Sequence, residues 1–344
     1  MLRHNIPWTK LRTPTSLTFE LKEKELQKSS TPTIYELSVN ALVSWQAHSL
    51  SNEGTDGSNK VMPRSQMLAD GSVTDACSGS IAKHHHAVLL AEYLAASGVP
   101  LCPACLQRDG RRAAALIERP EHQNVSVQQI LRNCGLCDAH GFLVTAKNAS
   151  SQQGTEARER NAKHSLVEFS FALGLPGRSQ KTMHLFTRSG DSKEEGQMLM
   201  KKPTRSGDYA LEVRYRSVGV GVDTDKWQVA IVDEQQRLLR HRAILSTLRD
   251  TLLSPDGAMT ATMLPHLTGL QGAVVVRKDV GRAPMYSALK EDFVARLVAM
   301  GSDTCSIYPF ETVDAFNIIL EELITTSTPC LPATYRAQQL LKEG

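Results

Sequence analysis

The sequence predicts an α+β fold, and three observations lead to this prediction. Apolar residues alternate with polar ones in several short stretches, which is the period of a half-buried strand. Two longer stretches repeat their apolar residues at the period of a helix. The order is strand, helix, strand, strand, helix, strand, which is the split βαβ or ferredoxin-like arrangement. These elements are expected at residues 35–45, 80–97, 167–173, 209–215, 233–254 and 273–276.

The first strand and the first helix have clear patterns. The apolar residues from Tyr35 to Trp45 fall on one face and the polar ones mostly on the other, so we expect a half-buried strand. A stretch rich in Gly, Ser, Asn and Asp, residues 49–76, separates this strand from the helix. The helix begins at about Ser80, and Gly98 and Pro100 end it.

The second half of the chain supplies the other elements. The strands at 167–173 and 209–215 flank a basic, glycine-punctuated segment, residues 177–207. Asp233 is a suitable N-cap for the second helix, and the apolar run at 273–276 predicts a buried strand. Further expected elements are a loop at 149–164, helices at 287–300 and 311–325, and an edge strand at 304–308.

Length and composition favour one domain with large insertions. A chain of 344 residues would allow two domains, but we interpret residues 34–344 as one domain with insertions at about 46–165 and 177–207. Residues 1–33 are polar and are interpreted as an N-terminal extension. No apolar run approaches the roughly 18 residues that cross a bilayer, so we expect no membrane partner.

Charge is unevenly distributed, although the formal net charge is only +3. Residues 178–216 are rich in Lys and Arg, whereas residues 291–322 are rich in Asp and Glu. A basic and an acidic face on one molecule suit a polyanionic partner and also head-to-tail stacking of copies. A solvated surface would give the same pattern.

The most specific motif is a pair of CxxC sequences at residues 102–105 and 134–137. Two such turns can supply four Zn–S bonds of about 2.3 Å and leave no position for a substrate, so we predict a structural zinc ion as cofactor. A redox dithiol is the alternative, but the first pair follows a helix end rather than a buried strand. The predicted ligands are Cys102, Cys105, Cys134 and Cys137, with His122 or His140 as possible substitutes for one thiol.

The other cysteines, Cys77, Cys305 and Cys330, occur singly. Since the sequence shows no signal peptide, we expect a cytoplasmic protein in a reducing compartment, with these three as free thiols.

Several motifs together resemble a known family. The segments His48–Gly54 and Ser78–His86 are similar to the DevR family of CRISPR-associated autoregulators, and the similarity spans most of residues 34–290. The resemblance implies a non-catalytic backbone subunit of a type I Cascade complex that polymerises along a CRISPR RNA (crRNA). It also implies an RNA-recognition-type palm, a fingers insertion that holds the zinc segment 99–140, and a hairpin thumb. Further matching segments are Asp225–Trp227, Arg237–Arg242, Pro265–His266 and Val274–Pro284.

The partners implied by this resemblance are crRNA, target DNA through the guide, and other copies of the chain in a head-to-tail helical filament. Other Cascade subunits are also implied: a large subunit, a subunit that caps the 5′ handle and a subunit that processes crRNA. A recruited nuclease and a recruited transposition machinery are both compatible with the resemblance.

Given the resemblance, the start of the first helix is a candidate phosphate site. Ser78, Gly79 and Ser80 precede free backbone N–H groups at the positive end of the helix dipole, which favours a phosphate. Lys83 lies one turn further along, and His84 is the expected contact among three consecutive histidines, because neighbours on a helix diverge by about 100°. Without the resemblance, Ser-Gly-Ser is an ordinary N-cap.

The thumb implied at 177–207 is the second candidate site. Its apolar residues Met183, Leu185, Phe186 and Met198 can wedge between bases, and its cations can neutralise phosphates. A disordered basic loop is the alternative. The remaining candidate RNA contacts are His48, Asn52, Arg64, Arg188, Lys201, Lys202 and Arg205.

Two other functions compete with this prediction. A guide-bound ribonuclease would use a loop aspartate such as Asp56 or Asp70, but the sequence shows no acid–base cluster beside either. A zinc-stabilised transcription regulator would need a recognition helix rich in Arg, Asn and Gln, and none is evident. We therefore expect no enzymatic activity.

Overall fold

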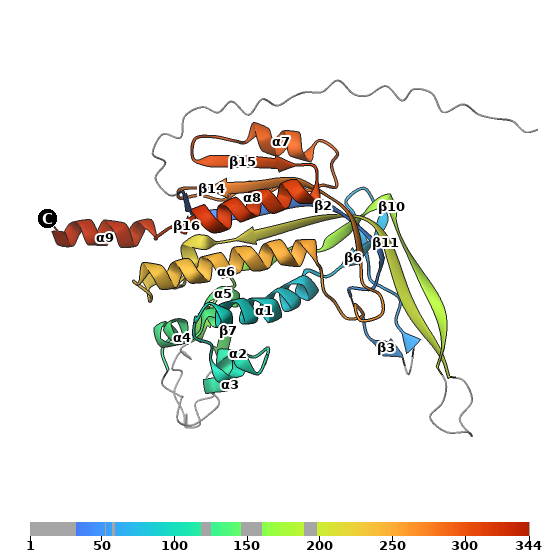
Figure 1. Cartoon of the computed structure of the whole chain (residues 1–344), viewed down its shortest axis with the longest axis horizontal. Coiled ribbons are helices and arrows are strands. Elements are labelled where there is room, and N and C mark those ends of the chain that lie inside the picture. Colours follow the sequence, from blue (N-terminus) through green and yellow to red (C-terminus); the bar gives the residue numbers. More distant parts are fainter. Residues whose placement is uncertain are drawn as a thin grey trace, which may run out of the picture. The chain divides into compact units, whose positions relative to one another are not determined.

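The largest sheet of the computed structural model has eight strands, which run in the order β15-β14-β2-β11-β10-β6-β5, with β9 paired to β11 (Figure 1). The structure describes residues 32–51, 53–56, 59–117, 125–145, 160–188 and 198–343. All pairings within this sheet are antiparallel. The strands are β15 (Cys305–Phe310), β14 (His266–Arg277), β2 (Glu36–His48), β11 (Met198–Tyr215), β10 (Ala172–Arg188), β6 (Val73–Cys77), β5 (Ser65–Met67) and β9 (Val167–Phe169).

Three helices cover one face of this sheet. Helices α1 (Gly79–Ala96), α6 (Glu234–Leu253) and α8 (Val313–Thr326) lie side by side (Figure 1), and their apolar residues share one core with alternate residues of β2. The antiparallel sheet with helices on one face confirms the α+β prediction at this level. Helix α1 falls inside the predicted insertion at 46–165, yet it packs on the sheet beside α6.

The second face of β2 is also covered, so the prediction of a half-buried strand is wrong. Almost every residue of β2 is buried. The segment after β14 crosses this face, where Ser38 Oγ donates to the carbonyl of Pro284 at 2.8 Å and Tyr286 N donates to Asn40 Oδ1 at 3.1 Å. Helix α7 (Phe293–Ala299) packs there too, against apolar residues of β14. The polar residues of β2 therefore face protein rather than solvent.

Other elements differ from the expectations in detail. Asp233 caps α6 as predicted, since its carboxylate accepts from Gln235 N and Gln236 N. The glycine- and serine-rich stretch 49–76 contains β5 and β6, which join the main sheet. The expected loop at 149–164 ends in a strand, β8 (Arg160–Lys163). Further elements that the sequence did not predict include β1 (Thr33–Ile34), β16 (Thr328–Pro329), β3 (Thr55–Asp56), β4 (Asn59–Lys60), β12 (Val222–Asp223), β13 (Gln228–Val229) and α9 (Ala333–Glu343).

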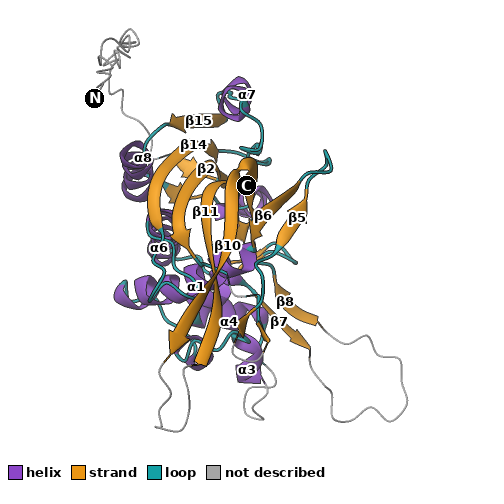
Figure 2. Ribbon diagram, turned by 90° about the vertical axis from the view of Figure 1, so that its right-hand side faces the viewer, coloured by secondary structure: helices purple, strands orange, loops and turns teal. Residues whose placement is uncertain are grey.

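The predicted thumb is a hairpin continuous with the sheet. Strands β10 and β11 begin inside the sheet and run on past its other strands (Figure 2), paired with each other from Ser179–Gly207 to Arg188–Met198. The expected hairpin is therefore an extension of two core strands. Residues 189–197, which connect these strands, lie outside the described residues.

The two CxxC pairs lie in a helical segment between α1 and β9. It consists of α2 (Pro103–Leu106), α3 (Ala113–Ile117), α4 (Val127–Asn133), α5 (Gly135–His140), β7 (Phe142–Thr145) and β8 (Arg160–Lys163). Its buried apolar residues belong to the same core as those of α1 and α6.

Residues 31–344 form one unit, and the predicted extension lies almost wholly outside the described residues. Within the described part of the chain, no helix is long and apolar enough to cross a membrane.

Candidate metal centre and nucleic-acid interface

The four cysteines of the CxxC pairs converge on one point. Their Sγ atoms all lie within 4.8 Å of one another, and all four residues are buried. The distances from Cys137 Sγ are 3.9 Å to Cys102 Sγ and 3.6 Å to Cys105 Sγ. A tetrahedron with Zn–S bonds of about 2.3 Å has S–S edges of about 3.8 Å. The cluster therefore fits a four-thiolate zinc site.

Local structure fixes each pair of thiols on a turn. Cys102 is the N-cap of α2, where Pro103 suits the first helical position, which needs no N–H donor. Cys134 is the N-cap of α5, and its Sγ accepts a hydrogen bond from Cys137 N at 3.3 Å. A dithiol enzyme needs only one such pair, whereas the convergence of both pairs is what a structural metal requires.

His140 does not replace a thiol. Its Nε2 lies 2.8 Å from Nδ1 of His86, and both rings are buried. Burial lowers the pKa of His86 to about 3 and holds the pKa of His140 well below 6.5, so both are neutral and one donates to the other. His122, the other alternative ligand, lies outside the described residues.

The zinc segment is joined to the core by a buried ionic cluster. The Asp138 carboxylate contacts Lys163 Nζ, accepts from Arg240 Nη1 at 2.9 Å, and accepts from Gly221 N at 2.9 Å. Burial is the main cause that lowers the pKa of Lys163, and the Asp138 charge opposes it. Since Asp138 belongs to α5 and Arg240 to α6, this cluster connects α5 to one of the helices that cover the sheet.

The candidate phosphate site at the start of α1 is partly as expected. Ser78 caps the helix by accepting from Ser80 N at 3.3 Å, and its hydroxyl lies 2.8 Å from that of Ser80. His84 is exposed, Lys83 is half-buried, and burial lowers the pKa of Lys83. At the helix N-terminus itself, Ser80 is exposed, whereas Gly79 is buried.

Gly79 has a different role from the predicted one. It is buried, and a Cβ at this position would lie 2.4 Å from the carbonyl oxygens of Phe169 and Ser170. The glycine is therefore required by close packing of α1 against the end of β9.

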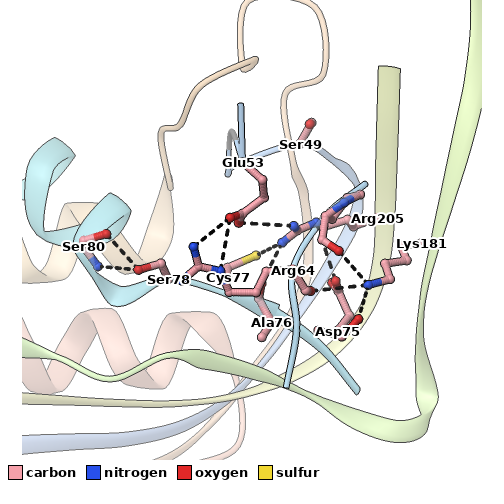
Figure 3. A network of polar contacts seen from close by, with 12 residues as sticks. Ser49, Glu53, Arg64, Asp75, Ala76, Cys77, Ser78, Ser80, Lys181 and Arg205 are labelled. Carbon is pink, nitrogen blue, oxygen red and sulfur yellow. Dashed lines mark hydrogen bonds and ion pairs between the residues drawn. The ribbon is translucent and has the colours of Figure 1, made fainter. Parts of the chain in front are cut away.

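Arg205 and His48 are also placed differently, because both are buried. Arg205 lies in a polar cluster with residues of β6 (Figure 3). Arg205 Nη1 donates to Cys77 Sγ at 2.6 Å and to Ala76 O at 3.2 Å. Its guanidinium lies 3.7 Å from Asp75 and 4.0 Å from Glu53. The prediction that Arg205 contacts phosphate directly is therefore wrong for this conformation.

His48 closes the other side of the same cluster. Its Nε2 lies 3.1 Å from the hydroxyl of Tyr209, which donates to Asp75 at 2.9 Å. Burial, aided by the charge of Arg205, lowers the pKa of His48 to about 3. A neutral, buried imidazole does not neutralise a phosphate, so His48 is a structural residue here.

Arg64 lies at the surface of this cluster. Two of its nitrogens contact the same Glu53 oxygen, at 3.2 and 3.1 Å, and its guanidinium lies 5.9 Å from the centre of the Phe171 ring. Lys181, which the sequence placed only in the basic segment, donates to Pro63 O at 2.7 Å (Figure 3). Both cations are thus held beside the base of the hairpin.

The hairpin itself carries exposed cations and apolar groups. Lys201 is exposed, and Lys202 Nζ lies 5.2 Å from the centre of the Phe186 ring. Leu185 is 61% exposed and Phe186 39%. Aromatic rings beside cations are a common surface for single-stranded nucleic acid. The side chain of Arg188 and the whole of Asn52 lie outside the described residues.

The structure gathers the candidates in two groups. Arg64 lies beside the cap of α1 (Figure 3), because Ala76 N donates to Arg64 O at 3.2 Å, and Lys83 and His84 follow along the helix. The second group lies on the hairpin and consists of Lys201, Lys202, Leu185 and Phe186. Sequence reasoning missed Glu53 and Asp75, which organise the base of the hairpin. Pairing of β6, β10 and β11 brings Asp75 near Arg205, and the loop after β2 adds Glu53, which no local pattern reveals.

Comparisons with known proteins give one clear family. A search of the curated proteins finds no match. Among solved structures, the chain is similar to one from a "CRISPR RNA-guided surveillance complex, pre-nicking", with a TM-score of 0.43, 12% identity, and coverage of 72% of this chain and 80% of that chain. A second, from a "CRISPR RNA-guided surveillance complex", has a TM-score of 0.45 and 11% identity, covering 84% of this chain and 97% of that chain.

The sequence comparison is more specific than the structural one. The model of the family described as CRISPR-associated negative auto-regulator DevR/Csa2 matches residues 39–296, a range that runs from β2 through the zinc segment and the hairpin to α7. The chain belongs to the CRISPR-associated DevR/Csa2 family.

Proposed function

We propose that this chain is a non-catalytic crRNA-binding subunit that polymerises along the guide as the backbone of a type I Cascade complex. Membership of a CRISPR-associated family supports a role in a CRISPR system. The element order β2-α1-β10-β11-α6-β14, with both helices on one face of an antiparallel sheet, supports a palm of the RNA-recognition type. Because this fold also occurs in proteins that bind no nucleic acid, the function must rest on the candidate contacts.

The observation that carries the proposal is the hairpin. It extends beyond the sheet and presents Lys201, Lys202, Leu185 and Phe186 within one short stretch of paired strands. Cations that neutralise phosphates and rings that stack on bases bind a single strand without reading its sequence. A subunit that carries many different guides needs this kind of recognition.

The start of α1 supplies a second, sequence-independent contact. The positive end of its dipole and the Ser78 and Ser80 hydroxyls suit a phosphate, and Lys83 on the helix and Arg64 beside the cap add positive charge. Two contacts on one subunit, one on the hairpin and one at α1, would hold successive parts of a guide strand and expose its bases for pairing with target DNA.

Zinc would act as a structural cross-link in this protein. When bound by the four thiolates, it closes the two CxxC turns into one unit and supplies no open coordination position. Residues near the thiols connect this unit to the helices, because His140 forms a hydrogen bond with His86 of α1 and Asp138 accepts one from Arg240 of α6.

The absence of catalysis is part of the proposal. Asp70, one of the two aspartates that a ribonuclease could use, accepts hydrogen bonds from the N–H of Ser72 at 2.9 Å and from its hydroxyl at 2.6 Å. These hydrogen bonds lower the pKa of Asp70, which makes it a poor general acid or base near neutral pH. The observed role is that of a turn residue, and Asp56 is an exposed residue of β3.

Head-to-tail assembly is supported by the distribution of exposed charge. Helix α8 and its surroundings expose Glu311, Asp314 and Glu322, none of which has an ion pair among the described residues. The exposed Lys201 and the half-buried Lys202 of the hairpin have the opposite sign. A contact between these two different surfaces would be heterologous, and such contacts build open filaments when they do not close into a ring.

Binding to single-stranded RNA tests this function. Purified protein should bind fluorescent RNAs of unrelated sequence with similar affinity, and the logarithm of the affinity should fall linearly with the logarithm of salt concentration. Cleavage of the bound RNA, or binding that requires duplex DNA of one sequence, would instead support the ribonuclease or the transcription regulator.

A further inference from the structure

The hairpin leaves the sheet at a pair of irregularities in strand pairing. The register between β10 and β11 shifts between Gly174 and Ser179, and the register between β11 and β2 shifts between Arg205 and Gly207. A bulge bends its strand and changes its direction. A Cβ on Gly207 would lie 2.5 Å from Ser179 Cα, so the two strands are tightly packed at this point. The direction of the hairpin is therefore determined here.

Arg205 lies at this bend and points inward. It is 1% exposed, although it belongs to a strand that becomes a projecting hairpin a few residues earlier. Its Nη1 donates to Ala76 and Cys77, the last residues of β6 before the cap of α1. One guanidinium thus connects the base of the hairpin to the start of α1 (Figure 3).

Two carboxylates balance this buried charge. Asp75 lies 3.7 Å from Nε of Arg205, and Glu53 lies 4.0 Å from its Nη2. Arg205 Nη2, Glu53 Oε1 and Asp75 Oδ1 have no hydrogen-bond partner among the described residues, so ion pairing holds them. A planar, forked cation can serve the carbonyl, the thiol and both carboxylates at once, and a lysine cannot.

The same cluster extends to the surface. The other oxygen of Glu53 accepts from Arg64, which is 46% exposed at its side chain. Glu53 therefore links a candidate RNA contact at the surface to the buried Arg205. A change in the position of Arg205 would be transmitted to Arg64 and to the hairpin together.

We propose that Arg205 is a positioning residue, which with Glu53 and Asp75 fixes the direction of the β10–β11 hairpin relative to the N-terminus of α1. This inference rests on the proposed function for its consequence: the hairpin and α1 carry the two RNA contacts. Arg205 then sets the distance between these contacts along one guide strand, and it does so without touching RNA.

The direct test measures the hairpin without RNA. Spin labels on Leu185→Cys and Ala95→Cys, both at exposed positions, report the distance between hairpin and α1, and the native cysteines of the described chain are buried. The labelled parent protein should give one narrow distance distribution. Arg205→Lys should broaden it about twofold or more, because a lysine keeps the charge and loses the fork.

Arg178→Lys is the matched control. Arg178 also lies at the base of the hairpin, but it is exposed, and its ion pair among the described residues is with Asp208, across the hairpin. It should leave the distribution unchanged. A distribution for Arg205→Lys that superimposes on the parent, or a parent distribution that is already broad, would overturn the inference.

Two further measurements separate this inference from loss of folding and from failure of the proposed function. If Arg205→Lys does not fold, Glu53→Gln keeps the shape of the cluster, removes one charge, and should broaden the same distribution. In the second measurement, folded Arg205→Lys should bind RNA within about threefold of the parent and lose regular nuclease protection along the guide. A parent that binds no RNA would refute the proposed function and leave the distance measurement intact, whereas unchanged protection with Arg205→Lys would overturn the inference.

Discussion

His86 of α1 and His140 of α5 lie 2.8 Å apart, Nδ1 to Nε2, although 54 residues separate them in the sequence. His140 follows the last cysteine of the metal cluster by three residues, and His86 belongs to the helix whose N-terminus is the candidate phosphate site. This contact makes the zinc segment a support for α1. In the proposed function, a zinc ion held there would support the candidate phosphate site through packing and not through direct contact.

Removal of one zinc ligand should prevent stable folding. Purified protein should contain one zinc ion per chain by elemental analysis. Cys134→Ser should be insoluble or rapidly cleaved by protease, because structural zinc contributes on the order of 10 kcal/mol to folding in small domains. Cys305→Ser is the control, since Cys305 is buried but lies outside the cluster. Equal protease resistance of both variants, with no bound zinc, would contradict the assignment.

Stability should fall as the pH is lowered through the range of an ordinary histidine. Burial lowers the pKa of His48 and of His241 to about 3, so the folded state keeps both neutral while the unfolded chain binds protons below about pH 6.5. The stabilising contribution is complete above pH 6.5 and is lost as the pH falls towards 3. Between pH 7.5 and 5.5 the loss should be on the order of 1 kcal/mol for each histidine.

His241→Gln provides the check on this pH dependence. His241 lies 2.8 Å from the Tyr215 hydroxyl and 3.0 Å from the Ser327 hydroxyl, far in sequence from the metal ligands, and Gln can replace part of these hydrogen bonds. The variant should be less stable at pH 7.5 and should lose less stability between pH 7.5 and 5.5 than the parent. A slope of thermal stability against pH identical to that of the parent would contradict the assignment of a neutral His241.

Charge reversal at the α1 site should weaken RNA binding without changing sequence preference. Lys83→Glu, alone or combined with Arg64→Glu, should lower the affinity for all RNAs alike and reduce the salt slope by about 0.7 for each lost phosphate contact. Lys226→Glu, at an exposed position outside both candidate groups, should have little effect. Fluorescence anisotropy at several salt concentrations measures both quantities. An effect on one RNA sequence only would count against phosphate recognition.

Deletion of the hairpin should separate folding from assembly. Removal of residues 184–204 with a short turn in their place leaves the sheet-paired parts of β10 and β11, so the variant should unfold at nearly the temperature of the parent. It should fail to form regular complexes on guide RNA and to stabilise hybrids with matched DNA. Deletion of α9, the last helix of the chain, whose Leu340 and Leu341 are exposed, is the control. Unchanged binding of matched DNA after the hairpin deletion would show that the hairpin is no thumb.

The sequence was sufficient for elements with a strong local signal. The period of apolar residues located α1 and α6, and the spacing of two CxxC pairs predicted the thiol cluster that the structure assembles. Strands β5 and β6 were missed because their stretch is rich in Gly, Ser and Asp and has no clear alternation. β6 becomes a strand by pairing with β10, and β5 by pairing with β6, which are properties of the sheet.

The sequence also did not show which charged residues are buried. Arg205 lies among many basic residues in the sequence, and charge alone does not show which of them turns inward. The answer depends on Glu53 and Asp75, which are 152 and 130 residues away along the chain and become neighbours only in the folded sheet. For the same reason β2 appeared half-buried, because the segment that covers its second face follows β14.

The most direct test of the central claim is the RNA that the chain retains when it is expressed with a CRISPR array and the other subunits. The account predicts that the purified protein carries guide RNA of one defined length, enriched far above its abundance in the cell, with several copies of the chain on each RNA. Protein that retains no RNA, or that retains cellular RNAs in proportion to their abundance, would contradict the account.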